Sequence, residues 1–437
     1  MSTLRCIVLL AVLLLPAAAS SQAHVGLLAP LDEIPLTSPS LLGARSLGMG
    51  GTAIAVADDA SAIGANPAAL ARLRRIEISG GIIRSTDDLS GTAFGSEFDT
   101  RLSSTSFSSL RFAYPVPTFR GSLVLGLSAD RAYSFDDDFV AAYTGDYQWG
   151  ENYSDLEDSV AVWDRVEDYV AGGSIYAWNF AAAFDASESV SFGAALTYYS
   201  GNYTRTFRFR AEDVNDESDN YDTHILYTTD DVDASGLRAT VGAIVYLGEQ
   251  VSCGVVVKSP TKLTFNVVES VSRVAEGPGG YDDEETIGYE NEVELPFSFS
   301  GGIAFSPTDL VMLAADLCYT DWSELRYDGE RVYLGDVEER VDAYRPVLDY
   351  SLGAEVSVPD WPLRVRAGYM SRPIAYEGLA VDRDRSYLTL GAGVLVDTVF
   401  SLDIAWMGAA FERSGEGFAY EESVNDNAFL LEAAYRF

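Results

Sequence analysis

Runs of carboxylates are the first residues in this sequence that could do chemistry. Asp136-Asp137-Asp138 and Asp282-Asp283-Glu284-Glu285 carry the oxygen ligands that Ca²⁺ and Mg²⁺ prefer. Neither run has the spaced ligands and the glycine of a calcium-binding loop, and such runs also occur on solvated, self-repelling surfaces. Two interpretations follow: the acidic loops bind divalent cations, or they form a solvated acidic rim. The lack of spaced ligands and of the glycine favours the rim.

A small, Ala/Gly-rich segment near the N-terminus carries the second candidate set. Its glycines at 48–51 permit a tight backbone, but no strand–turn–helix unit surrounds them, which argues against a nucleotide-binding loop. The aspartates at 58–59 can cap a short turn, and the Asn-Pro pair at 66–67 fits the start of a short helix. We expect a compact plug inside a barrel. The residues expected to shape it are Gly48, Gly50, Gly51, Asp58, Asp59, Asn66 and Pro67.

The composition offers little for catalysis. His24 and His224 are the only histidines in 437 residues, so a nucleophile activated by histidine is not expected, and a carboxylate protease is the enzyme class left open. The net charge of −37 repels phosphate and argues against nucleic-acid binding. Cys253 and Cys318 lie in apparent strands, where a disulfide is possible but not implied. We predict no enzyme activity, no cofactor and no catalytic or structural metal.

The N-terminus has the features of a secretory signal peptide. Arg5 precedes the apolar run 6–15, which Pro16 and small residues follow. Cleavage after Ala19 or Ala23 fits the small-residue pattern, and the apolar run is too short to span a bilayer. No later apolar run is long enough for a transmembrane helix.

The rest of the chain reads as strands with a two-residue period. In 429–437 and 386–396, for example, apolar residues occupy every second position. Alternation over eight or more residues indicates strands rather than helices. The expected segments are 75–85, 105–114, 121–133, 173–184, 190–209, 236–247, 251–269, 287–305, 310–327, 344–357, 363–372, 385–396, 399–412 and 424–437.

Short and long connections largely alternate between these segments. This alternation is typical of an outer-membrane barrel, with turns at one end and loops at the other. The expected long connections are 86–104, 134–172, 210–235, 270–286, 328–343, 373–384 and 413–423. Nearly half of the 66 acidic residues lie in four stretches within or overlapping these connections, 134–171, 211–235, 270–290 and 328–343.

The sequence thus predicts an all-β fold, a 14-stranded antiparallel transmembrane β-barrel with an N-terminal plug of short helices. A soluble β-sandwich or propeller is the alternative. Long strands, a charged inner face and the C-terminal Tyr435-Arg436-Phe437 favour the barrel, which alone leaves no unpaired edge in lipid. The expected domains are a signal peptide over 1–23, the plug over 24–74 and the barrel over 75–437.

Several segments resemble one family of outer-membrane proteins. Residues 44–51, 57–61 and 66–68 are similar to the N-terminal hatch of the long-chain fatty acid transporters of the FadL/TodX type. Segments 258–265, 295–305 and 316–323 and the strand 363–369 with Pro373 resemble the same family. The resemblance implies a monomeric porin-like barrel in the bacterial cell outer membrane that takes up hydrophobic compounds by passive diffusion.

The resemblance also implies a ligand path, but it leaves the cargo open. Family members release their ligand sideways through a wall gap at a kinked third strand, for which Gly126 is the candidate here, and bind ligand carboxylates with lumen cations. Arg364 and Arg366 are the lumen candidates, although salt bridges to Glu355 or Asp316 are the stronger interpretation. The acidic loops make neutral hydrophobics as plausible as fatty acids. A PorV-like barrel serving protein secretion is the alternative function.

Overall fold

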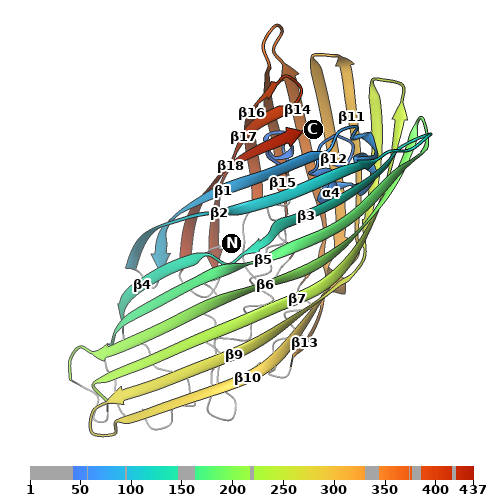
Figure 1. Cartoon of the computed structure of the whole chain (residues 1–437). Coiled ribbons are helices and arrows are strands. Elements are labelled where there is room, and N and C mark those ends of the chain that lie inside the picture. The colour runs from blue at the N-terminus through green and yellow to red at the C-terminus, as the bar shows by residue number, and fades with distance from the viewer. Residues whose placement is uncertain are drawn as a thin grey trace.

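The structure, a computed structural model, describes residues 43–56, 58–93, 96–145, 163–216, 221–329, 344–373, 375, 385–415 and 420–437. Within these ranges the chain forms one antiparallel sheet that closes on itself (Figure 1). It closes because β1 (Glu77–Ala93) pairs with both β2 (Ser96–Val116) and β18 (Tyr420–Arg436). The other strands are β3 (Leu123–Ser134), β4 (Asp137–Gly145), β5 (Trp163–Ser187), β6 (Val190–Asp213), β7 (Thr223–Leu247), β8 (Val251–Lys258), β9 (Thr261–Glu276), β10 (Tyr281–Leu295), β11 (Ser298–Thr308), β12 (Val311–Asp321), β13 (Arg326–Gly329), β14 (Pro346–Ser357), β15 (Leu363–Arg372), β16 (Arg385–Val396) and β17 (Phe400–Gly415).

The 18 strands form the fourteen passages of the predicted barrel, because four passages are each divided in two. The divisions fall at 135–136, 259–260, 296–297 and at the short helix η5 (Trp322–Glu324). Pro260 and Pro296 lie at two of them, where a residue without an N–H cannot continue the ladder. The prediction of a 14-stranded antiparallel barrel is therefore confirmed.

Several of the expected long connections are wrong. Most of 86–104, 210–235, 270–286 and 413–423 belongs to strands, as do β4 and the start of β5 within 134–172. The strands β1, β6, β7, β9 and β10 in particular extend far beyond the segments that the alternation marks. Buried polar residues such as Asp230 and Glu269 interrupt the inward apolar face there and hide the two-residue period, while pairing with the neighbouring strands keeps the backbone regular. Much of the acidity assigned to loops therefore lies on strands.

The outward face of β6 shows where the membrane-facing belt ends. Phe192, Leu196 and Tyr198 are exposed and apolar, whereas the outward residues that follow, such as Asn202 and Arg208, are polar. The strand continues to Asp213, about 50 Å beyond Tyr198. We call the parts of β5, β6, β7, β9 and β10 beyond this belt the outer wall; Figure 1 shows these long strands projecting from the barrel.

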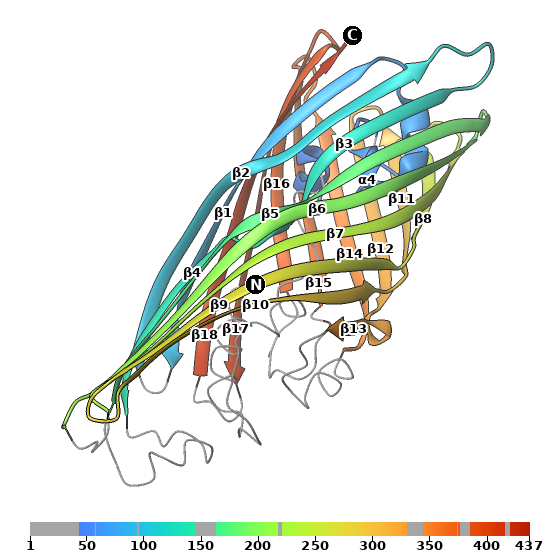
Figure 2. The same ribbon diagram turned by 60° about the horizontal axis from the view of Figure 1, so that its bottom comes forward.

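The plug lies inside the ring of strands (Figure 2). Its helices are α3 (Ala44–Gly48), α4 (Ala62–Ala65) and η3 (Pro67–Arg72). Helix η3 packs against β5, β6 and β7, and α3 packs against β15 to β18. None of the helices in the described ranges could span a bilayer. The expected signal peptide and residues 24–42 of the expected plug lie outside the described residues.

Candidate functional site

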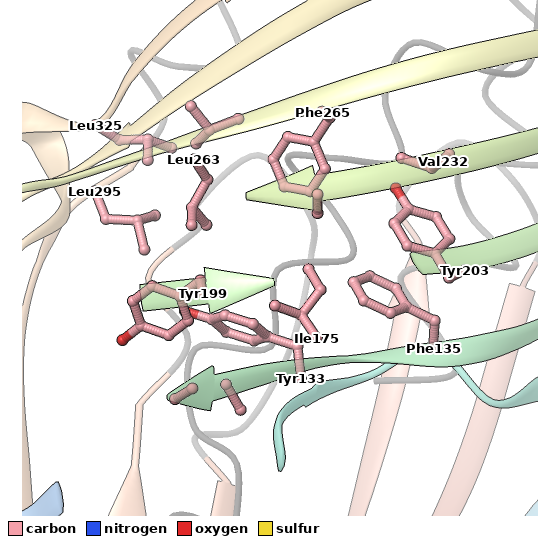
Figure 3. Packing of buried hydrophobic residues seen from close by; sticks show 14 of the residues in the cluster. Tyr133, Phe135, Ile175, Tyr199, Tyr203, Val232, Leu263, Phe265, Leu295 and Leu325 are labelled. Carbon is pink, nitrogen blue, oxygen red and sulfur yellow. The ribbon is translucent and has the colours of Figure 1, made fainter. Parts of the chain in front are cut away.

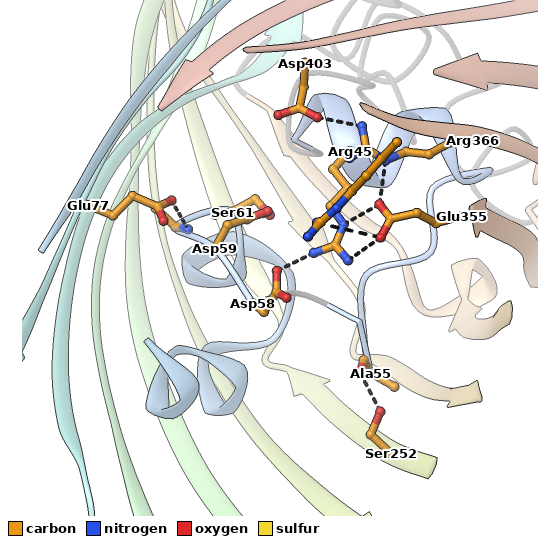
Figure 4. Close-up of polar contacts among 12 residues, drawn as sticks. Arg45, Ala55, Asp58, Asp59, Ser61, Glu77, Ser252, Glu355, Arg366 and Asp403 are labelled. Atoms are coloured by element: carbon orange, nitrogen blue, oxygen red, sulfur yellow. Dashed lines mark hydrogen bonds and ion pairs between the residues drawn. The ribbon is translucent and has the colours of Figure 1, made fainter. Parts of the chain in front are cut away.

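A buried ionic network anchors the plug to the barrel wall (Figure 4). Arg45 of α3 donates to Glu355 of β14 from Nε and from Nη2, both at 2.9 Å, and it also pairs with Asp58. Arg366 of β15 donates to Glu355 at 2.7 Å and to Asp403 of β17 at 2.6 Å. The two guanidinium groups therefore share one carboxylate, which ties plug and wall together.

Arg364 and Arg366, the lumen cations expected to meet a ligand, take part in this network. Arg366 is buried between two carboxylates, and Arg364 lies 3.8 Å from Glu355 with a third of its side chain exposed. Asp316, the other expected salt-bridge partner, instead accepts hydrogen bonds from the backbone N–H groups of Ala53 and Ile54 at 2.6 and 2.9 Å. Arg366 thus fixes the wall carboxylate to which the plug is anchored, and Arg364 lies at the exposed edge of this network.

Asp58 and Asp59 have separate roles in the plug. Asp58 pairs with Arg45, while Asp59 accepts hydrogen bonds from the backbone N–H and the hydroxyl of Ser61. Burial on its own raises the pKa of the Asp59 carboxyl, but Arg45 and the Ser61 hydrogen bonds outweigh it, so the pKa lies below its ordinary value. Burial on its own lowers the pKa of Arg45, but Asp58 and Glu355, and less strongly Asp59, outweigh it and keep this pKa above its ordinary value. Both groups are therefore charged at neutral pH.

Glycines on both sides allow the plug backbone to touch the wall. Gly50 and Gly51 have φ angles of 70° and 82°, and Gly50 N–H donates to Thr389 Oγ1 at 2.9 Å. A Cβ added to Gly368 of β15 would overlap the backbone nitrogen of Gly50, and one on Gly391 would press on Gly48. The glycine pattern therefore reflects close packing of plug against wall.

Asn66 and Pro67 form the helix start that the sequence predicts. The Asn66 side chain accepts from Ala68 N–H at 3.1 Å and donates to the carbonyl of Ile54 at 2.7 Å, and Pro67 begins η3. Asn66 is fully buried and lies against Gly242 of β7. The pair caps η3 and links it both to the preceding turn and to the wall.

A cluster of apolar side chains lines the barrel beyond the plug (Figure 3). On β6, Gly193 touches η3, whereas Tyr199 and Tyr203 further along the strand belong to this cluster. The Tyr133 and Tyr199 rings lie 6.1 Å apart. We call this set the apolar cluster; its labelled members are Tyr133, Phe135, Ile175, Tyr199, Tyr203, Val232, Leu263, Phe265, Leu295 and Leu325.

Two cations adjoin the apolar cluster. The guanidinium of Arg238 on β7 lies 5.5 Å from the Tyr199 ring centroid and donates to the Thr261 hydroxyl. Lys258 on β8 is half-buried and lies opposite Thr240 of β7, two residues from Arg238, which is the like charge that acts on it. Neither cation contacts a carboxylate in the described part of the chain. The sequence-based search missed this pair, although Lys258 is one of only two lysines, because no local pattern links it to Arg238.

The third passage through the wall is broken, but not at Gly126. Gly126 pairs regularly with Ala113 and Ala181 and lies against Ile63 of the plug. The register shifts further along β3, between Arg131 and Tyr133, and the strand stops at Ser134 before β4 begins. The expected position of the kink is therefore corrected to 132–136.

The broken passage leaves an unpaired line in the wall. β4 pairs with β5, and residues 96–108 of β2 pair with β1, but no pairing joins this part of β2 to β4 among the described residues. We call this line the seam. The Phe107 and Tyr176 rings face each other at 6.5 Å where β2 leaves β3. The seam thus begins where the outward face of β2 changes from apolar to polar residues.

The remaining candidates form no site of their own. No group of three or more His, Cys, Asp or Glu residues suited to a metal ion occurs in the described ranges. Asp136 pairs with Arg131, Asp283 pairs with Arg273 of β9, and the side chains of 137–138 are not described. Cys253 and Cys318 are free thiols. His224 packs between Trp163 and Tyr221.

Comparisons with known proteins agree with this architecture. Residues 38–415 match the family model described as "Outer membrane protein transport protein (OMPP1/FadL/TodX)". A search of curated protein sequences finds no significant match.

Solved structures similar to this chain include a FadL homologue from Pseudomonas aeruginosa, with 14% identity, a TM-score of 0.62 and 91% of this chain and 98% of that chain covered. The toluene transporter TodX from P. putida has 14% identity and a TM-score of 0.62, with 90% and 98% covered. CymD, a monoaromatic hydrocarbon channel, has 16% identity and a TM-score of 0.54, with 91% and 97% covered.

The similarity to these solved structures establishes the fold only. The match to the family model establishes the family. The family is one of transport channels, not enzymes, and it does not favour the secretion alternative. The chain therefore belongs to the OMPP1/FadL/TodX family of transport proteins and is a β-barrel of the bacterial outer membrane.

Proposed function

We propose that this protein takes up hydrophobic compounds that carry a carboxylate, of which long-chain fatty acids are the simplest. The observation that supports this is the pair Arg238 and Lys258 beside the apolar cluster. A partly buried cation without a carboxylate partner has lost hydration without compensation, and a ligand carboxylate supplies the missing partner. The chain of the ligand then lies against the apolar cluster, where each buried CH₂ contributes about 0.8 kcal/mol.

The ligand leaves through the seam in this proposal. The plug fills the barrel below the apolar cluster, and its backbone lies against wall glycines, which opposes passage straight through. The seam lies beside the broken third passage, whose residues Tyr133 and Phe135 belong to the apolar cluster. A short sideways path therefore connects the cluster with the outer surface of the wall, at the edge of the apolar belt near Phe107.

Neutral aromatic compounds are the second candidate cargo. The outward face of β10 exposes Glu290 and Glu294, so the outer wall repels anions on approach. The toluene transporter TodX and the hydrocarbon channel CymD have the same fold as this chain, which supports neutral aromatic compounds as a candidate cargo.

Uptake and binding together test the proposal. A strain without its own fatty acid importer should regain growth on oleate when it expresses this protein, and the purified protein in detergent should bind radiolabelled oleate. Unboiled protein should migrate faster than boiled protein on a gel, which checks that the barrel is folded. Binding of toluene but not oleate would support the second candidate, and binding of neither by folded protein would reject both.

A further inference from the structure

The break in the third passage inserts an aromatic ring into the apolar cluster. Phe135 follows the last residue of β3 and is only 2% exposed. Its ring stacks on Tyr203 of β6, with centroids 3.9 Å apart and an angle of 14° between the planes. Figure 3 shows the two rings facing each other. Phe135 is therefore part of the wall and part of the candidate ligand site at once.

Hydrogen bonds to Gly173 and the Arg131 side chain hold the backbone around Phe135. Phe135 N–H donates to the carbonyl of Gly173 at 3.1 Å, and Gly173 has a φ angle of 131°, which favours glycine. The next residue, Asp136, accepts from Arg131 Nη2 at 2.5 Å and from the Gly173 N–H at 3.4 Å. Arg131 also donates to the Ser134 and Ser174 hydroxyls. We call the Arg131–Asp136 pair the clasp.

The clasp borders the seam. β4 begins at Asp137, directly after the clasp, and pairs with β5 alone among the described strands. A movement of Phe135 away from Tyr203 therefore pulls on Asp136 and on the start of β4. No ladder of backbone hydrogen bonds to β2 resists that movement, because β2 pairs with β3 only from Ser109 onward.

A ligand chain competes with Phe135 for the same surface. The Tyr203 ring, together with Val232 and Val267 on the neighbouring strands, belongs to the apolar cluster. An apolar chain that binds there gains most contact by lying on Tyr203, the position that Phe135 now occupies. Stacking of two rings is a modest interaction, so a chain that buries several CH₂ groups can replace it.

We infer that Phe135 is a ligand-displaced latch that couples occupation of the apolar cluster to opening of the seam. With the site empty, Phe135 rests on Tyr203 and the clasp keeps β4 in place. A bound ligand chain displaces Phe135. Residues 135–136 then move with it, and the seam between β2 and β4 loosens. The ligand thereby selects the open arrangement of the wall. This inference rests on the proposed function, because it assigns the latch to the site proposed for the ligand.

A reversible cross-link between the latch and its partner tests the coupling. In a C253S/C318S background, the variant F135C/Y203C is treated with a short bifunctional thiol reagent that contains a reducible disulfide. We expect the cross-linked protein to lose at least 90% of its oleate uptake and to recover it after reduction. The matched control is F184C/F192C, whose native rings lie 6.0 Å apart on the lipid-facing side of the paired strands β5 and β6.

The control should keep its uptake when it is cross-linked, because β5 and β6 are already joined along their length. Unchanged uptake by cross-linked F135C/Y203C that still binds oleate would overturn the latch and leave the proposed function standing. Failure of the folded wild type to bind oleate or toluene would instead reject the proposed function. The gel-mobility shift on boiling shows whether each variant is folded.

Equilibrium binding gives a second, independent measurement. If the ligand must displace Phe135, the F135A variant should bind oleate about threefold to tenfold more tightly, since the competing stack is absent. The F135A barrel should also take up oleate at least as fast as the wild type. Weaker binding by folded F135A would show that Phe135 is a fixed wall of the site and would contradict the latch.

Discussion

Arg45 of the plug and Glu355 of the barrel wall form a two-point salt bridge, with Nε–Oε2 and Nη2–Oε1 distances of 2.9 Å. Their side chains are 10% and 6% exposed. Because Glu355 also accepts from Arg366, the removal of this one carboxylate takes a buried partner from two guanidinium groups at once, leaving Arg45 only with Asp58 and Arg366 only with Asp403. A buried charge that loses its partner is much more costly than the pair was favourable.

The E355Q variant should therefore loosen the plug. We expect a loss of about 3 kcal/mol in the stability of the plug–wall contact, and with it an increased ion leak in planar bilayer recordings. The control is E284Q, since Glu284 is exposed on β10. A variant that folds, by gel mobility, and stays as ion-tight as the wild type would contradict the anchoring role.

Close packing of glycine against glycine predicts a steric effect. In G368A the new Cβ would overlap the Gly50 nitrogen, so the plug must shift, at a cost of about 1–3 kcal/mol. Thermal unfolding and bilayer conductance measure the change. G301A is the matched control, because a Cβ on Gly301 meets no atom within 4 Å and alanine is favoured over glycine inside a strand. If G368A and G301A have equal unfolding temperatures and conductances, the contact between Gly368 and Gly50 does not limit the size of the residue at position 368.

The cation pair predicts selectivity between cargoes. Charge-assisted hydrogen bonds contribute about 1.5–3 kcal/mol, so R238Q or K258M should weaken oleate binding about tenfold or more. Toluene binding should change less than twofold, because toluene has no carboxylate. R208Q, at an exposed outward position on β6, should bind oleate like the wild type. Equal losses for oleate and toluene would indicate that the substitutions damage the site in general.

The clasp predicts a dependence on acid pH. Burial raises the pKa of the Asp136 carboxyl, but the hydrogen bond and charge of Arg131 outweigh it, so the pKa is lowered in the folded protein. Such a group stabilises the fold fully above its unfolded pKa of about 4, and this contribution is lost as the pH falls through the lower folded value.

Thermal unfolding between pH 7 and pH 2 measures this contribution. The wild type should lose the clasp below about pH 4, whereas D136N should be less stable at pH 7 and show a smaller loss on acidification. The difference between the two proteins should therefore shrink as the pH falls. If the difference in stability between the wild type and D136N stays constant from pH 7 to pH 2, the Arg131–Asp136 ion pair is not its cause.

The strands and their order could be predicted from sequence because each depends on nearby residues. Alternation in 429–437 marks β18, and the glycine, proline, aspartate and serine of the short turns mark one end of the barrel. Asn66-Pro67 likewise predicts the start of η3, since a helix cap is local. The extensions of β1, β6, β7, β9 and β10 could not be predicted, because polar residues on the inward face, such as Asp230 and Glu269, interrupt the alternation.

The sequence alone determined the class of the protein: alternating strands that form a barrel, a segment of small residues ahead of them, and only two histidines. The tertiary structure decided which charges are satisfied. Arg366 meets two carboxylates from other strands, whereas Arg238 and Lys258 lie near each other and pair with no carboxylate in the described ranges. Closure of the sheet brings together residues far apart in the sequence, and neither their pairing nor the stack of Phe135 on Tyr203 leaves a local pattern.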